Sequence, residues 1–304
     1  MSGRDVEIQR RVAEEDIATI SALLHAAEHA DDHHPLGEHT WLDLVQGGRS
    51  GYAGFVARER PGGRVVGYVH VSKGQSSWAI EFVVHPSRRE PGDPVGPLLV
   101  AAAIDEIRAE GGGHVHLWVP KPDDAHEQIA SANGLHRGRD LFQMRRPLPV
   151  TDHVSSVTTR PFVVGEDEES WLAVNNRAFD AHPEQGAWDL DTLRRREREP
   201  WFDAGGFLLH EVDGRVAASC WTKVHDDDPP LGEIYVISVD PAFQGRGLGR
   251  ELVLAGLEHL AAEGLRHGML YVDASNVPAV TLYEKLGFQV DHIDRAYVGD
   301  VRPA

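Results

Sequence analysis

The chain carries two patterns of apolar and polar positions, and they follow one another in the same order in each half. Helical spacing, with apolar residues three and four apart, is found at residues 12–27, 97–110, 168–179 and 248–263. Strand-like runs are found at residues 51–58, 64–71, 78–84, 114–119, 206–212, 215–224, 232–239 and 268–272. A pattern that recurs at half the chain length indicates two related domains.

Two short segments align the halves. Residues 82–86, an apolar strand end followed by a proline, parallel residues 237–241. Near the end of each half, residues 132–135 parallel residues 285–288. A proline after an apolar run ends a strand because it has no N–H to donate to the sheet. The halves therefore match at positions that determine where a strand ends.

The repeat predicts the domain organisation and the fold class. We expect an N-terminal domain at 1–146, a linker at 147–159 and a C-terminal domain at 160–304. The linker is rich in proline and polar residues, which favour an exposed, extended chain. Helices that alternate with short antiparallel runs predict an α/β fold. Each domain is expected to be a mixed, mostly antiparallel twisted sheet flanked by helices.

Composition and charge narrow the classes of function. Hydrophobic residues make up 41% of the chain and charged residues 26%, as in globular proteins, and no apolar run reaches the length of a membrane span. The first eleven residues have no apolar core of a signal peptide, so we expect a cytoplasmic protein. A net charge of −18 disfavours nucleic acid and anionic membranes. We expect a monomer that acts on a small molecule. The single cysteine, Cys220, is expected to be a packed thiol.

A glycine-rich turn at residues 239–250 is the strongest chemical signal. It reads Val-Asp-Pro-Ala-Phe-Gln-Gly-Arg-Gly-Leu-Gly-Arg and joins a strand end to a helix. Glycines let successive backbone N–H groups approach a phosphate, and the helix N-terminus adds partial positive charge. The turn lacks the lysine of nucleoside-triphosphate loops, and its glycine spacing differs from the dinucleotide fingerprint. It predicts anion binding without naming the ligand.

A second motif at residues 276–288 reads as a capped helix. Ser275 or Asn276 suits the N-cap, Pro278 the first turn and Gly287 the C-terminal end. Ala279, Leu282 and Leu286 form an apolar stripe, beside which Tyr283 is equally well explained as a core residue.

Together the two motifs resemble the GNAT family of acetyltransferases, in the family's order and separation. The resemblance implies acetyl-CoA as cosubstrate and no metal, with Glu233 as base and Tyr283 as the acid that protonates the leaving thiolate. It also implies a set of coenzyme-binding residues that includes the corresponding strand end of the first half. These are Ile237, Ser238, Val239, Gln244, Gly245, Arg246, Gly247, Leu248, Gly249, Arg250, Asn276, Val277, Pro278, Ala279, Val280, Thr281, Phe82, Val83 and Val84.

The first half serves as an internal control for these roles. The position of Glu233 is occupied there by Trp78, and that of Tyr283 by Ala130. Its turn, residues 88–97, has additional prolines, which lack an N–H, and acidic residues where phosphate would lie. We therefore expect catalysis in the second half only and weak or absent coenzyme binding in the first.

A narrower resemblance covers nearly the whole chain. Segments 35–38, 143–148, 174–179, 182–188, 221–225 and 232–236 are similar to tandem GNAT enzymes of actinobacteria that acetylate the amine of a cysteinyl-glucosaminyl-inositol. The resemblance implies that this acceptor contacts Glu38, Glu184, Lys223, Glu233 and Tyr271. Since Glu38 lies in the first half, that half is expected to contribute to acceptor binding.

Other interpretations remain open. A tandem GNAT enzyme for another amine, such as an aminoglycoside or a protein N-terminus, has the same motifs, and so has a non-catalytic acetyl-CoA sensor. The histidine-rich segment 25–39 has no zinc-binding pattern and is interpreted as an exposed polar loop.

Overall fold

The structure is a computed structural model of the chain. It describes residues 6–10, 15–31, 33–37, 40–41, 43–44, 51–60, 63–74, 77–180, 188–225 and 229–304. None of the described helices has both the length and the apolar composition that a membrane crossing requires.

The chain forms two compact units that differ from the predicted boundaries. Unit 1 comprises Met1–Leu141 together with His292–Ala304, and unit 2 comprises Phe142–Asp291. The C-terminal residues belong with unit 1 because the last strand, β12 (Gln289–Val301), pairs antiparallel with β5 (Gly113–Pro120). Backbone hydrogen bonding between distant segments thus overrides proximity in sequence.

Unit 1 is a sheet with helices on both faces, as predicted for each domain. The strand order is β1-β2-β3-β4-β5-β12-β6; β4 and β5 are parallel, whereas the β1–β2, β2–β3, β3–β4 and β5–β12 pairs are antiparallel. Its other elements are β1 (Val6–Arg10), α1 (Glu15–Asp31), β2 (Tyr52–Glu59), β3 (Val65–Lys73), β4 (Ser77–Val84), η1 (Pro86–Arg88), α3 (Val95–Ala109), α4 (Asp124–Ala132) and β6 (His136–Pro147). One core lies between the sheet and α3, and a second lies against α1.

Unit 2 repeats this architecture. The strand order is β6-β11-β10-β9-β8-β7, where β6 enters from its second half. Its elements are β7 (Arg160–Pro161), α5 (Glu168–Ala178), α6 (Leu190–Arg196), η2 (Ala204–Gly206), β8 (Phe207–Val212), β9 (Arg215–His225), β10 (Leu231–Val239), η3 (Pro241–Phe243), α7 (Leu248–Ala262), β11 (His267–Asp273) and α8 (Val277–Lys285).

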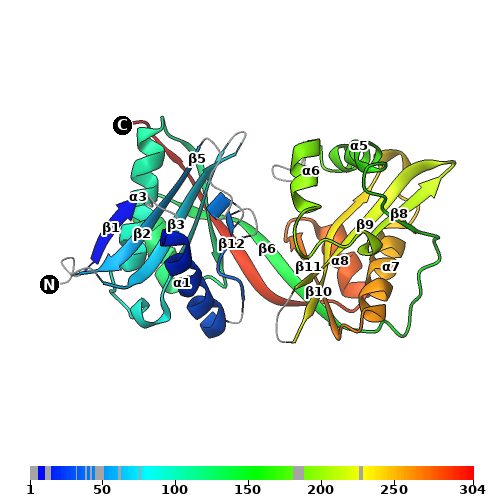
Figure 1. The fold of residues 1–304 in the computed structure, drawn as a ribbon, viewed down its shortest axis with the longest axis horizontal. Helices are drawn as coiled ribbons and strands as arrows, with labels where there is room; N and C mark the ends of the chain where they lie inside the picture. Colours follow the sequence, from blue (N-terminus) through cyan, green and yellow to red (C-terminus); the bar gives the residue numbers. More distant parts are fainter. Residues whose placement is uncertain are drawn as a thin grey trace. The chain divides into compact units, whose positions relative to one another are not determined.

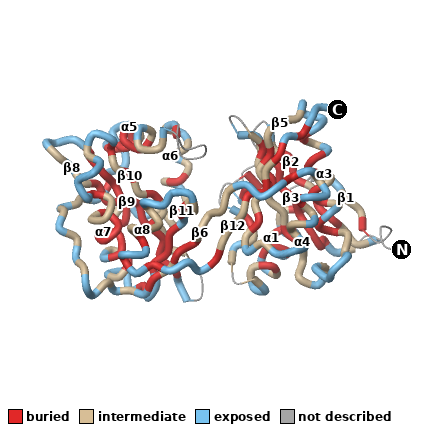
Figure 2. The backbone as a smooth tube through the Cα atoms, turned by 180° about the vertical axis from the view of Figure 1, so that it is seen from behind, coloured by how far each residue is buried: buried red, intermediate tan, exposed pale blue. Residues whose placement is uncertain are grey.

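Each face of the unit 2 sheet has its own core. An aromatic cluster around Trp171, Phe207 and Trp221 lies under α5 and α6, where Trp221 and Phe207 stack at 4.3 Å between ring centroids. An aliphatic cluster lies under α7 and α8. Figure 2 shows the buried residues concentrated in the strands and on the inner faces of the helices.

The predicted linker is a segment of unit 2. Regular structure is absent between the end of β6 and the start of β7, as expected. Yet the N–H groups of Ser155 and Ser156 donate to the carboxylates of Glu258 and Glu251 on α7, at 2.7 and 2.6 Å. The segment therefore runs along α7, where carboxylates satisfy its backbone donors.

Candidate active site

Two parallel strands of unit 2 separate where the coenzyme is expected. β10 and β11 pair only at Gly232–Gly268 and Glu233–Met269, whereas β10 continues to Val239. Among the described residues, no strand pairs with the β11-facing edge of β10 beyond this point. Its N–H and C=O groups are available there to the amides of an extended ligand.

A β-bulge accompanies the separation. In the pairing with β9, Ile234 opposes Thr222 and Val236 opposes Trp221, so Tyr235 is the extra residue. A bulge bends its strand and increases the local twist. Unit 1 differs, because β4 pairs with β5 from Ser77 to Glu81 and with β3 without a register shift.

The glycine turn leaves the start of α7 open to an anion. Gly245 and Gly247 have φ of +75° and +80°, a region that favours glycine, and no atom lies within 4 Å of a Cβ built at either position. Gly247 is the N-cap and makes no side-chain capping bond. The helix N-terminus therefore presents backbone donors and partial positive charge to the exposed turn.

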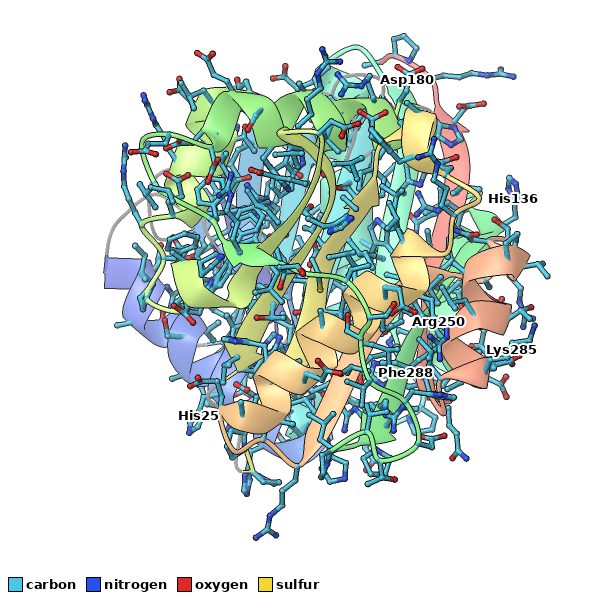
Figure 3. All side chains as sticks on the ribbon, turned by 90° about the vertical axis from the view of Figure 1, so that its right-hand side faces the viewer. His25, His136, Asp180, Arg250, Lys285 and Phe288 are labelled. Carbon is cyan, nitrogen blue, oxygen red and sulfur yellow. The ribbon has the colours of Figure 1, made fainter. Side chains whose placement is uncertain are left out.

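Two arginines add charge to this turn. The Arg246 guanidinium lies 5.1 Å from the Phe243 ring, and Arg250 in the first turn of α7 pairs with Glu251 at 2.6 Å. Figure 3 labels Arg250 among the side chains of this helix. The turn thus combines free backbone donors with two cationic side chains, a combination suited to an anionic group.

The corresponding helix start in unit 1 already holds an anion. The Asp93 carboxylate accepts the Val95 N–H at 3.0 Å and binds the Arg88 guanidinium at 2.7 Å. Pro94 and Pro97 contribute no N–H. The acidic residue and the prolines that distinguish this turn in the sequence therefore lie at the helix start.

Tyr283 lies in α8 within the aliphatic core of unit 2. Its side chain is 7% exposed and contacts the Phe288 ring at 5.9 Å between centroids. Burial, with a smaller contribution from Cys220, raises the pKa of Tyr283 to about 12. The phenol is therefore a protonated donor over the whole physiological range.

Burial likewise raises the pKa of the Cys220 thiol to about 12, so it stays protonated.

The residues at the start of α8 combine capping with exposure. Asn276 is the N-cap, and its side chain accepts the Ala279 N–H at 3.3 Å, as the sequence predicted. Val277 is 63% exposed, and Pro278 occupies the first turn. The start of α8 is thus capped by its own Asn276 side chain and open to solvent.

Glu233 is a buried carboxylate with a histidine partner. It is 7% exposed, and its Oε2 atom lies 2.7 Å from Nε2 of His225. The distance is that of a charge-assisted hydrogen bond. His225 is not among the residues predicted from the sequence, although its spacing of two from Lys223 puts both side chains on one face of β9.

The other predicted acceptor residues that are described lie on the same face of the sheet. Lys223 opposes Glu233 in the β9–β10 register, and its Nζ atom lies 4.4 Å from the Trp201 ring centroid and 5.4 Å from that of Tyr235. Tyr271, two residues after the partner of Glu233 in β11, is 40% exposed and accepts a hydrogen bond from Gln143 at 2.8 Å.

Two predicted acceptor residues, Glu38 and Glu184, lie outside the described residues. In the first half, Val83 is buried in the core under α1, and Phe82 contacts the ring of His126 at 5.8 Å between centroids. The structure therefore brings together Glu233, Lys223, His225 and Tyr271 on one face of the unit 2 sheet.

Comparisons with known proteins identify the family. The acetyltransferase (GNAT) family profile matches residues 171–288, which lie in unit 2. Curated relatives include the mycothiol acetyltransferase of Thermobispora bispora, 43% identical over 96% of this chain and 99% of the relative. That of Thermomonospora curvata is 42% identical over 98% of each chain.

Solved structures share the fold. A GCN5-related N-acetyltransferase from Sphaerobacter thermophilus superposes with a TM-score of 0.73 at 22% identity, over 100% of this chain and 98% of the other. A tandem GNAT protein from the clavulanic acid biosynthesis pathway gives 0.73 at 17% identity, over 99% of this chain and 100% of the other. The predicted α/β fold and the GNAT resemblance are confirmed, and the chain belongs to the mycothiol acetyltransferase family of tandem GNAT proteins.

Proposed function

We propose that this chain transfers the acetyl group of acetyl-CoA to the cysteinyl amine of 1D-myo-inositol 2-(L-cysteinylamino)-2-deoxy-α-D-glucopyranoside, giving mycothiol and CoA. Family membership over nearly the whole chain is the observation that carries the proposal. The open start of α7, the separation of β10 from β11, and Glu233 and Tyr283 in one unit support it.

Glu233 is the proposed base. An α-amino group has a reference pKa near 8, so a carboxylate that acts directly or through a water suffices to take its proton. The free amine then attacks the thioester carbonyl. His225 holds one carboxylate oxygen of Glu233, which fixes the orientation of the carboxylate.

Backbone N–H groups of residues 237–239 are proposed to hold the pantetheine arm and to stabilise the oxyanion of the tetrahedral intermediate. When the intermediate collapses, the carbon–sulfur bond breaks, the nitrogen loses its second proton to solvent and Tyr283 donates its proton to the thiolate. Solvent then reprotonates Tyr283, and Glu233 releases the proton of the amine. The proposed sites for the coenzyme are the turn at 244–250 and the start of α8 at 276–281.

Lys223 and Tyr271 are proposed to contact the acceptor from the face that carries Glu233. Both have polar groups suited to sugar and inositol hydroxyls. Glu38 and Glu184 are proposed contacts on the resemblance alone.

The test is an acetyl-transfer assay with four acceptors at equal concentration. These are the cysteinyl pseudodisaccharide, glucosaminyl-inositol without the cysteinyl group, free cysteine and an aminoglycoside. We expect the first to give the highest kcat/KM by at least about a hundredfold, since two parts of the acceptor are recognised together. A preference for the aminoglycoside would support an enzyme for another amine, and binding without turnover would support a sensor. Glu233→Gln is the matched variant, and it should keep acetyl-CoA binding but lose turnover.

A further inference from the structure

Lys223 and Glu233 form a cross-strand pair of opposite charge whose side chains have separate partners. They oppose each other directly in the β9–β10 register. Directly opposed residues have Cβ atoms close enough for an ion pair, and opposite charges there attract. In the structure, however, Glu233 lies 2.7 Å from His225, and the Lys223 ammonium lies over Trp201 and Tyr235.

The two rings are held in place around the ammonium. Tyr235 is the bulged residue of β10, and its ring contacts the Trp201 ring at 5.1 Å between centroids. Its hydroxyl accepts a hydrogen bond from the Arg196 guanidinium at 2.9 Å. Arg196 lies 4.1 Å from the Trp188 ring and is 2% exposed. Aromatic rings and cations thus alternate through space in the order Trp188, Arg196, Tyr235, Lys223 and Trp201.

Unit 1 offers an internal comparison. Lys73 of β3 opposes Trp78 of β4 and lies 5.0 Å from its ring, at the position where unit 2 has Lys223 and Glu233. In unit 1 an aromatic residue replaces the carboxylate, and the lysine contacts it directly. In unit 2 the carboxylate is present, and two additional rings contact the lysine.

We propose that Trp201 and Tyr235 form an aromatic clamp that holds the Lys223 ammonium away from the Glu233 carboxylate, which stays bonded to His225. Trp201 and Tyr235 are then positioning residues for acetyl transfer. The inference rests on the proposed role of Glu233 as base. A carboxylate in contact with an ammonium is a weaker base, since the cation stabilises its charged form.

The charged and titratable groups around Glu233 determine how loss of the clamp would alter the pH–rate profile. Lys223 and His225 lie on β9, Tyr235 on β10 and Tyr271 on β11, and Arg196 of α6 reaches the Tyr235 hydroxyl. Among these, Lys223 is the cation opposite Glu233. Because Glu233 and His225 are bonded, the acid limb of the pH–rate profile belongs to the pair. An ammonium brought close to the pair moves this limb to lower pH.

The experiment compares pH profiles of kcat/KM for the pseudodisaccharide in the full-length enzyme. Trp201→Leu should move the acid limb down by about one pH unit. It should also lower the plateau roughly tenfold, because the base is weaker. Adding Lys223→Met to this variant should return the limb to the wild-type position, although the acceptor KM rises. Trp201→Phe retains a ring and should retain the wild-type limb.

Trp118→Leu is the matched control. It removes a ring that lies 5.5 Å from Arg139 in unit 1, and the profile should stay unchanged. A wild-type limb in Trp201→Leu, or a displaced limb in the double variant, would overturn the clamp. Glu233→Gln separates this result from the function. If Glu233→Gln keeps wild-type turnover, the assigned base is wrong, whereas loss of turnover together with a wild-type acid limb in Trp201→Leu rejects the clamp alone.

An NMR measurement on the unmodified enzyme tests the geometry without activity. The chain has four lysines, so ¹³C-labelled lysine gives a simple spectrum, in which Lys223→Met identifies the Lys223 signal. The Lys223 Hε protons should be shifted upfield by the ring currents of Trp201 and Tyr235. An unshifted Lys223 signal would overturn the clamp even if Trp201→Leu does not fold.

Discussion

The Asp93 carboxylate accepts a hydrogen bond from the Val95 N–H, at 3.0 Å, where α3 begins. A side chain of unit 1 therefore occupies the kind of helix start that α7 of unit 2 leaves without a side-chain cap. Since an anion at a helix N-terminus is stabilised by the same donors whether it is a carboxylate or a phosphate, the two helix starts are expected to differ in coenzyme binding.

Gly247→Glu and Gly92→Glu test this difference as a matched pair. The two glycines have φ of +80° and +87°, and neither has an atom within 4 Å of an added Cβ, so the backbone strain is comparable. Gly247→Glu should weaken acetyl-CoA binding at the catalytic unit by at least about tenfold, through negative charge beside the phosphates. Gly92→Glu should change it less than about twofold. Calorimetry together with the KM for acetyl-CoA measures both, and equal losses would contradict the asymmetry.

Tyr283→Phe should lower kcat roughly a hundredfold, the magnitude typical of a lost general acid. The Kd for acetyl-CoA should stay within about twofold, because only a hydroxyl is removed. The phenol, whose pKa is raised to about 12 by burial, is protonated throughout the range from pH 6 to 9, so the loss should be the same at each pH. Single-turnover rates check this where chemistry is rate-limiting. Tyr68→Phe, which removes a fully buried hydroxyl from unit 1, is the control. Wild-type single-turnover rates in Tyr283→Phe would remove Tyr283 from the acid role.

Glu38→Ala should raise the KM for the pseudodisaccharide and leave the acetyl-CoA affinity intact. Losing one charge-assisted hydrogen bond to a sugar hydroxyl or to the ammonium costs roughly 1.5–3 kcal/mol. That corresponds to a roughly ten- to hundredfold higher KM if the acceptor binds in rapid equilibrium. Steady-state kinetics compares it with Glu110→Ala, an exposed carboxylate of the same unit. If the KM of Glu38→Ala stays within about twofold of wild type, the first half does not contribute this contact.

Asp294→Asn should change how stability depends on pH. Burial and the nearby Glu81 raise the pKa of Asp294 to about 7, against an opposing effect of Lys121. A carboxyl group whose pKa is higher in the folded state than in the unfolded state contributes most to the free energy of unfolding below its unfolded-state pKa. The contribution is lost as the pH rises through its folded-state pKa. Wild-type stability should therefore fall by roughly 1–3 kcal/mol between pH 4 and 8 from this residue.

Denaturant unfolding at several pH values measures the Asp294 contribution. The asparagine variant, which cannot ionise, should lack this part of the slope. Asp300→Asn, with an exposed side chain in the same strand, is the control and should keep the wild-type slope. A slope that is the same in wild type and Asp294→Asn would show that Asp294 ionises normally.

The sequence by itself determined the repeat, the fold class and the family, because these depend on local features. Periodicity follows from the geometry of helix and strand, and the turn at Gly245 and Gly247 requires residues that adopt positive φ. Comparison of the halves also identified the acidic residue and prolines that close the helix start of α3, since a proline has no N–H in any fold.

Only the tertiary structure decided which distant segments meet. The last strand joins unit 1 because its backbone pairs with β5, and the segment after Pro147 runs along α7 because Glu251 and Glu258 accept its N–H groups. The same holds for the site. Strand alternation places Lys223 and His225 on one face, but only the structure shows that His225 bonds Glu233 while the Lys223 ammonium lies over Trp201, a residue from another segment. Side-chain partners are set by the register of strands and the packing of rings over them, and neither is encoded in the spacing of residues along the chain.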